Sequence, residues 1–229
     1  MATDVLRVLP KAILFDLDGT LADTAPDLIG AIHKIQISRG DAPTPYTTLR
    51  PFASAGARGL IDAALGIRPE DIIFEALKTE FLENYKLAIA EKSVLFDGVT
   101  DMLQELKIRS ISWGIVTNKA ARLTDLLIPQ IGLQHAGCVV SGDTTPYAKP
   151  HPAPLLEAAA RLQLPATRCW YVGDDLRDIQ AGQAAGMPTI AAAWGYCGTS
   201  APASWNASAL LNDPLALIAQ LDSCARGAD

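Results

Sequence analysis

Short apolar runs alternate with amphipathic helical patterns over much of this chain. The runs that predict strands are Ala12–Phe15, Ser112–Val116, Cys138–Val140, Cys169–Val172 and Thr189–Ala193. The patterns that predict core helices are Thr100–Ile108, Ala120–Ile128, Pro154–Leu162, Leu176–Ala185 and Pro214–Leu221. Because apolar strands that alternate with amphipathic helices form parallel sheets with right-handed crossovers, the sequence predicts a doubly wound α/β fold.

The interval between Ala22 and Lys92 breaks this alternation. It contains no persuasive strand, and its periodicity predicts the helices Ala25–Ser38, Thr47–Phe52, Arg58–Leu65 and Glu70–Ala88. Roughly seventy residues therefore separate the first two strands, far more than a usual βαβ connection. We expect a helical cap domain over residues 22–95, inserted by flexible links near 21–24 and 93–98. The α/β core then comprises residues 1–21 and 96–229.

Two aspartates end the first predicted strand, in the sequence Asp16-Leu17-Asp18-Gly19-Thr20-Leu21. Alternate strand residues point to the same face, so both carboxylates lie on one side of the strand tip. Two like charges at this place must be solvated or paired. A metal ion would resolve the conflict, leaving one carboxylate to attack an electrophile and the other to move a proton. Gly19 permits a sharp turn there.

Two other interpretations of this motif stay open from its residues alone. A helix-flanked calcium loop shares its spacing of aspartates, but the glycine of such a loop stands at the sixth position and Gly19 stands at the fourth. A strand, not a helix, also precedes the motif. Asp18-Gly19 by itself is compatible with a simple hairpin turn.

Polar residues also follow the later predicted strands, where open α/β sheets bind ligands. Thr117-Asn118-Lys119 follows the second strand, and its hydroxyl and backbone N–H groups suit either a phosphate oxygen or a helix cap. Lys149 lies beyond the third strand, in a segment stiffened by Pro150 and Pro152. Its ammonium either binds an anion there or is solvated like an ordinary surface lysine.

The fourth strand runs into three carboxylates, in the sequence Gly173-Asp174-Asp175-Leu176-Arg177-Asp178. Acidic residues here would cap the following helix and complement its dipole. Two adjacent acids and a third one turn later exceed what a cap requires. Carboxylate oxygens are the ligands that magnesium prefers.

The four strand-end motifs together resemble those of the haloacid dehalogenase-like hydrolase superfamily, whose first motif reads Asp-x-Asp-Gly-Thr. The resemblance covers essentially the whole chain and implies a Rossmann-type core. It implies that Asp16 is the nucleophile that forms an aspartyl-phosphate, and that Asp18 protonates the leaving alkoxide and then activates water. It also implies that Thr117, Asn118 and Lys149 bind the phosphoryl group.

The same resemblance implies a magnesium cofactor. Its ligands would be Asp16, Asp174 and the backbone carbonyl of Asp18, with Asp178 in a supporting or occasional direct role. Asp175 stands where relatives often have serine, so its role is less defined.

The second aspartate narrows the expected chemistry to phosphoryl transfer. Relatives that dehalogenate lack an acid at the position of Asp18, because a halide leaves without a proton. The chain resembles the phosphoglycolate phosphatase branch, and the segments 172–179 and 193–196 with Trp205 resemble bacterial N-acetylmuramic acid 6-phosphate phosphatases even more closely. A sugar phosphomutase and a non-catalytic binding module on the same fold remain alternatives.

A specificity group is expected from the segment Ser54-Ala55-Gly56-Ala57-Arg58-Gly59 of the cap. Its glycines allow close approach, and Arg58 suits a carboxylate or sugar oxygen of the substrate. The competing interpretation is a helix-capping turn that carries a solvated arginine.

Composition and charge exclude several other classes of function. The formal net charge is −6 and the basic residues are scattered, which argues against nucleic-acid or membrane-surface partners. The four cysteines show no CxxC spacing, which favours reduced thiols over disulfides or a zinc site. We therefore expect a cytoplasmic monomer or homodimer whose partner is a small phosphomonoester.

Overall fold

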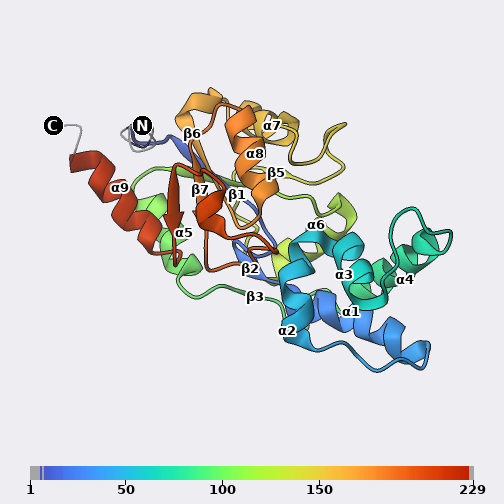
Figure 1. The fold of residues 1–229 in the computed structure, drawn as a ribbon. Helices are drawn as coiled ribbons and strands as arrows, with labels where there is room; N and C mark the ends of the chain where they lie inside the picture. Colours follow the sequence, from blue (N-terminus) through green and yellow to red (C-terminus); the bar gives the residue numbers. More distant parts are fainter. Residues whose placement is uncertain (1–5, 7, 227–229) are drawn as a thin grey trace.

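A six-stranded parallel sheet lies at the centre of the fold (Figure 1). The computed structural model describes residue 6 and residues 8–226. The order across the sheet is β5-β4-β1-β6-β7-β8. Its strands are β1 (Ala12–Phe15), β4 (Ser112–Val116), β5 (Val139–Val140), β6 (Cys169–Gly173), β7 (Thr189–Ala192) and β8 (Ala209–Leu211). The predicted doubly wound α/β class is confirmed.

Helices cover both faces of this sheet (Figure 1). Every residue of β1 is buried, and alternate residues serve opposite faces. Ala12 and Leu14 pack with the helices α7 (Ala153–Arg161) and α8 (Leu176–Ala184). Ile13 and Phe15 belong to the larger core on the other face, with α5 (Val99–Ile108), α6 (Ala121–Gln130) and α9 (Ala216–Arg226). This two-sided burial explains why β1 is a continuous apolar run.

Four of the helices between β1 and β4 gather beside the sheet, not on one of its faces (Figure 1). They are α1 (Ala25–Ser38), α2 (Tyr46–Leu49), α3 (Gly56–Leu65) and α4 (Phe74–Leu87), with the 3-10 helix η2 (Arg50–Ala55) between α2 and α3. Apolar side chains from α1, α3 and α4 pack against one another. These helices therefore share a core of their own that continues into the core of the sheet.

The structure corrects several predicted boundaries. The strands β2 (Ala22–Asp23) and β3 (Val94–Leu95) pair antiparallel where no strand was expected and where flexible links were predicted. The predicted helix Thr47–Phe52 is divided between α2 and η2, because Pro51 has no N–H for a continuous helix. The helix predicted from residue 70 begins only at Phe74, after a turn in which the Asp71 carboxylate accepts a hydrogen bond from the Arg68 amide.

The first motif forms a turn between β1 and β2. The backbone amide of Gly19 donates to the carbonyl of Ala22, and β1 itself pairs only with β4 and β6 among the described strands. A strand and not a helix precedes the motif, so the calcium-loop interpretation is wrong. Because β1 does not pair with β2, the simple hairpin interpretation is wrong as well.

All four cysteines are free thiols, as expected from their spacing. The remaining short elements are the 3-10 helices η3 (Ala166–Arg168) and η4 (Pro202–Ser204). Within the described part of the chain, no helix has the length and apolar content needed to cross a membrane.

Candidate active site

The predicted site residues meet at the carboxyl edge of the sheet. Asp16 follows β1 directly, Thr117 follows β4, and Asp174 follows β6. Lys149 reaches the same place from the loop after β5, and Asp178 lies in the first turn of α8. All five side chains are buried. Burial of so many polar groups in one place indicates a functional site, because each buried polar group needs a partner there.

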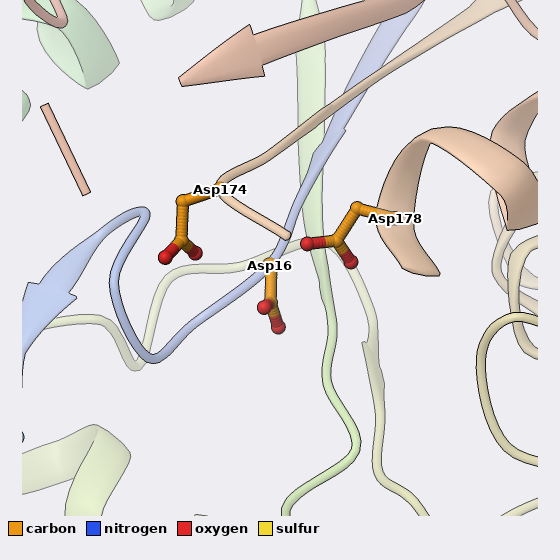
Figure 2. Close-up of side chains that lie close together, drawn as sticks. All are labelled: Asp16, Asp174 and Asp178. Atoms are coloured by element: carbon orange, nitrogen blue, oxygen red, sulfur yellow. The ribbon is translucent and has the colours of Figure 1, made fainter. Parts of the chain in front are cut away.

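Three of these residues form an acidic cluster. Carboxylate oxygens of Asp16, Asp174 and Asp178 all lie within 4.8 Å of one another. Figure 2 shows that Asp16 comes from one segment, at the end of β1, and that Asp174 and Asp178 come from the segment that leads into helix α8. Hard oxygen ligands at this spacing fit a divalent cation such as magnesium.

Asp174 is held by hydrogen bonds to both of its oxygens. Its Oδ1 accepts a bond of 2.9 Å from the Thr20 hydroxyl. Its Oδ2 accepts a bond of 2.9 Å from the Tyr196 amide and one of 3.0 Å from the Ser54 hydroxyl. Ser54 belongs to η2, so a residue of the helical insertion reaches the acidic cluster directly.

Two glycines make room for the Asp174 carboxylate. Gly19 has a φ of +90°, and a Cβ at this position would lie 2.2 Å from Asp174 Oδ2. A Cβ at Gly195 would lie 2.3 Å from both Asp174 Cβ and the Gly19 carbonyl oxygen. Both contacts are far inside van der Waals distance, so only glycine fits at either position.

The Lys149 ammonium lies among four oxygens. Its Nζ is 2.9 Å from the Val116 carbonyl, 2.8 Å from the Tyr171 hydroxyl and 2.7 Å from Asp178 Oδ1. It also forms an ion pair of 2.9 Å with Asp16 Oδ1. These contacts hold a fully buried cation at the base of the site.

The cluster carries excess negative charge when all its groups are ionised. Three carboxylates face the single ammonium of Lys149. Burial raises the pKa of Asp16 to about 7, and the nearby Lys149 works against this rise. Burial and the neighbouring carboxylates of Asp16 and Asp178 raise the pKa of Asp174 well above its ordinary value. A divalent cation would balance this charge and favour the ionised carboxylates.

The two oxygens of Asp16 have different surroundings. Oδ1 accepts a bond of 2.8 Å from the Leu17 amide and faces Lys149. No hydrogen bond from the described residues reaches Oδ2. One oxygen is thus fixed while the other is free to react.

Asp18 has a cationic partner that the sequence did not reveal. The Lys119 ammonium lies 2.8 and 3.0 Å from the two Asp18 oxygens, and the Thr24 hydroxyl donates to Oδ1 at 2.5 Å. Lys119 is buried and directly follows the Thr117-Asn118 pair at the end of β4. That strand-end position was the available signal.

Other acidic and amide groups of the motifs act within the scaffold. Asp175 caps α8, since its carboxylate accepts from the Arg177 amide at 2.9 Å and its own amide donates to Asp178 Oδ2 at 3.1 Å. The Asn118 side chain exchanges two hydrogen bonds with the backbone of Lys149. Asp175 therefore caps the helix, as one interpretation of the sequence expected. Both Asp178 oxygens already have hydrogen-bond partners, namely Lys149 and Tyr171 at Oδ1 and the Asp175 amide at Oδ2.

Tyr196 joins the sheet to the start of the helical insertion. Its hydroxyl accepts hydrogen bonds of 2.8 and 2.9 Å from the amides of Thr24 and Ala25, which begin α1. Arg50 of η2 stacks over its ring at 4.9 Å and pairs with Asp23. The amide of the same tyrosine binds Asp174, so one residue links the insertion to the acidic cluster.

A sequence profile of the haloacid dehalogenase-like hydrolases matches residues 13–192. The chain belongs to the haloacid dehalogenase-like hydrolase family. The match includes the strand-end residues from Asp16 to Asp178. The family that the motifs resemble is therefore confirmed.

Several relatives of this hydrolase have named activities. It is 46% identical over 207 residues to a phosphoglycolate phosphatase of Xanthomonas campestris pv. campestris (strain 8004), which covers 90% of this chain and 93% of the relative. It is 37% identical over 219 residues to an N-acetylmuramic acid 6-phosphate phosphatase of Pseudomonas putida, covering 95% and 98% of the two chains. A crystal structure of a predicted phosphoglycolate phosphatase from Haemophilus somnus shares the fold, with a TM-score of 0.81, 24% identity and coverage of 91% and 96%.

A cavity of about 260 Å³ lies over the acidic cluster of the hydrolase. The sheet side contributes Asp16, Asp18, Thr117, Lys119 and Lys149. The insertion contributes mostly apolar side chains, namely Leu28, Ala53, Ala55, Ala57, Phe81 and Leu82. The cavity therefore has a charged base and a largely apolar opposite wall, which suits a ligand with a phosphate at one end.

Arg58 does not reach this cavity. It lies in the first turns of α3, its side chain is exposed, and it is absent from the cavity wall. The preceding residues of the same segment, from Ser54 to Ala57, do line the cavity. The structure therefore supports the segment as a contact region and places the Arg58 side chain in solvent, outside this cavity.

We expect the substitution Arg58→Ala to leave the kcat/KM of the hydrolase nearly unchanged. The kcat/KM for 2-phosphoglycolate and for N-acetylmuramic acid 6-phosphate should stay within about twofold of the wild type, as is usual for exposed side chains. Steady-state kinetics with Arg68→Ala, another exposed arginine of the insertion, gives the matched comparison. A tenfold loss seen only for Arg58→Ala would contradict this assignment.

Proposed function

We propose that this hydrolase is a magnesium-dependent phosphatase that cleaves a small-molecule phosphomonoester through an aspartyl-phosphate. The observation that carries the proposal is the Asp16 carboxylate, buried at the base of the cavity with Oδ1 fixed by the Leu17 amide and Lys149. Its free Oδ2 suits attack on phosphorus. The kinship with named phosphatases over nine-tenths of the chain supports the same reaction.

The surrounding residues have matching roles in this proposal. Asp16 Oδ2 forms a bond to phosphorus while the bond from phosphorus to the ester oxygen breaks, and the carboxyl group of Asp18 gives a proton to the leaving alkoxide. Asp18 then takes a proton from the water that attacks the aspartyl-phosphate, which releases phosphate and restores Asp16. Lys149 and Thr117 hold the phosphoryl oxygens, and Lys119 keeps Asp18 in place.

Magnesium fits the donor set at the acidic cluster. We propose that Asp16 and Asp174 hold it together with the backbone carbonyl of Asp18. Asp178 keeps a supporting role, because its oxygens are bonded to Lys149, Tyr171 and the Asp175 amide. When bound, the cation supplies positive charge that offsets the phosphoryl oxygens.

The chain offers a division into core and cap that suits this chemistry. We propose residues 1–21 and 96–229 as the core and residues 22–95 as the cap, with β2 and β3 at the crossings. A cap that covers the cavity excludes water from the charged base and brings contacts to the organic part of the substrate. Free cysteines support the proposal of a cytoplasmic location.

Two substrates have specific support. Phosphoglycolate is favoured by the relative at 46% identity, and N-acetylmuramic acid 6-phosphate by the relative that matches 95% of this chain. We propose a phosphoglycolate phosphatase-like activity, with N-acetylmuramic acid 6-phosphate as the second candidate. Both present the same phosphomonoester to the base of the cavity.

Phosphate release from a panel of esters tests the proposal. The purified protein is assayed with 2-phosphoglycolate, N-acetylmuramic acid 6-phosphate, common sugar phosphates and p-nitrophenyl phosphate, with magnesium and with excess EDTA. We expect hydrolysis that requires magnesium and a clear preference for one natural ester. Turnover unaffected by EDTA would refute the role of the metal, and the absence of phosphate release from every ester would refute the phosphatase proposal.

A further inference from the structure

Tyr85 is a buried cavity residue whose hydroxyl lacks a partner. It lies near the end of α4, is 0% exposed, and belongs to the cavity wall. In the described part of the chain, three buried side-chain polar atoms have no hydrogen-bond partner, namely Tyr85 Oη, Arg168 Nε and Thr189 Oγ1. Of these, only the Tyr85 hydroxyl belongs to a residue that lines the cavity.

The neighbouring Lys119 ammonium carries only donors, so the proton of the Tyr85 hydroxyl has no acceptor among the described residues, and folding alone does not account for it. A buried donor without a partner costs free energy, and phenylalanine would fill the same space without that cost. The other two fully buried or nearly buried tyrosines near the site are satisfied. The Tyr171 hydroxyl lies 3.0 Å from both the Val116 carbonyl and Asp178 Oδ1, either of which accepts its proton, and the Tyr196 hydroxyl accepts hydrogen bonds from two backbone amides. The exception at Tyr85 points to a partner that enters from the cavity.

The position of Tyr85 is close to the proposed acid. The Lys119 ammonium lies 4.6 Å from the centre of its ring, and the same ammonium binds both oxygens of Asp18. Burial raises the pKa of Tyr85 to about 12, so the hydroxyl keeps its proton at neutral pH. It is therefore a neutral hydrogen-bond donor on the side of the cavity where the leaving alkoxide forms.

Other polar groups on the cap wall of the cavity already have partners. The Ser54 hydroxyl donates to Asp174, and Lys78 forms a half-exposed ion pair with Glu75. The nearest residues of α4 in the wall, Phe81 and Leu82, are apolar. A single donor in an apolar wall is the usual way for a pocket to orient a ligand.

We propose that the Tyr85 hydroxyl donates a hydrogen bond to an oxygen in the organic part of the substrate. It thereby selects esters of oxygen-rich alcohols, such as sugars and hydroxy acids, over simple aryl phosphates. This inference rests on the proposed phosphatase function. A site built to bond a substrate oxygen discriminates strongly against an ester that lacks it, because the donor then stays unpaired.

The substitution Tyr85→Phe tests this selection. The probes are 2-phosphoglycolate and N-acetylmuramic acid 6-phosphate, with phenyl phosphate as the ester without oxygen beyond the phosphate group. For the better of the two oxygenated esters, we expect kcat/KM to fall at least ten times more than it falls for phenyl phosphate. The melting temperature should be equal to or above that of the wild type, because the substitution removes an unpaired buried group. Tyr46→Phe, which changes an exposed tyrosine of the cap, should leave kcat/KM for the oxygenated esters and for phenyl phosphate unchanged.

Three outcomes would overturn the inference while leaving the phosphatase proposal intact. The first is an equal loss on phenyl phosphate and on the oxygenated esters. The second is a clear drop in melting temperature or a loss of folding, which would show that the hydroxyl serves the fold. The third is a wild-type enzyme that prefers phenyl phosphate to both oxygenated esters. Failure of the wild type to hydrolyse any ester would instead reject the proposed function itself.

Discussion

Replacement of Asp16 by asparagine is expected to abolish phosphomonoester hydrolysis, with a loss of about 10⁴-fold or more in kcat. An amide oxygen does not form the covalent intermediate, and the neighbouring Oδ1 contact with Lys149 holds the side chain without supplying a nucleophile. The measurement is steady-state phosphate release with saturating magnesium.

The same substitution should not destabilise the protein in the absence of magnesium. It removes one of three crowded carboxylates, while Lys149 keeps its contacts with Asp178, Tyr171 and the Val116 carbonyl. The melting temperature in EDTA should therefore equal or exceed the wild-type value. Asp97→Asn, which alters an exposed acid outside the site, provides the control. Turnover near the wild-type rate would eliminate Asp16 as the nucleophile, and collapse of the fold would show that its charge has a structural role.

The substitution Lys149→Met should damage both stability and activity. Without the ammonium, the buried carboxylates of Asp16 and Asp178 lose their only salt-bridge partner among the described residues. Breaking a buried ion pair in this way costs about 3–5 kcal/mol of unfolding free energy. Loss of the charge beside the phosphoryl group should also lower kcat by about 10²–10³-fold or more.

Denaturant unfolding and steady-state kinetics measure the two effects separately. Lys86→Met, an exposed lysine on α4, should change neither quantity appreciably. Saturating magnesium should restore part of the lost stability, because the cation supplies charge to the same carboxylates. A Lys149→Met protein as stable and as active as the wild type would show that the ammonium is dispensable.

The elements that carry the site were accessible from the sequence because their signals are local. The strand Ser112–Val116 has the predicted bounds, and β1 is identified by four consecutive apolar residues that are buried on both faces. The strand β8 was missed because an apolar run of three residues is too short to distinguish from a loop, and the middle residue, Leu210, is exposed. The β2–β3 pair was missed because two-residue strands have no periodicity to detect.

The sequence predicted which charged residues belong to the site, but not which residues they contact. The sequence placed Asp16, Asp174 and Lys149 at strand ends, and the structure brings them together. The strand-end position of Lys119 did not show that its partner is Asp18, because that contact joins residues 101 positions apart. Periodicity marks Tyr85 as a buried helical position, but it does not show that its hydroxyl lacks a partner. Arg58 was singled out for its charge, but whether its side chain faces the cavity depends on where α3 begins.

The central position of β1 has a consequence for how the protein acquires its activity during synthesis. Ala12 pairs with Ser112 on one side and with Cys169 on the other, so β1 is synthesised about 100 and 157 residues before the two strands that flank it. Such long-range contacts close slowly and only after most of the chain is available. A nascent chain that stops before Tyr196 lacks the amide that holds Asp174. We therefore expect activity only after translation has passed Tyr196, and not in proportion to the length of chain translated.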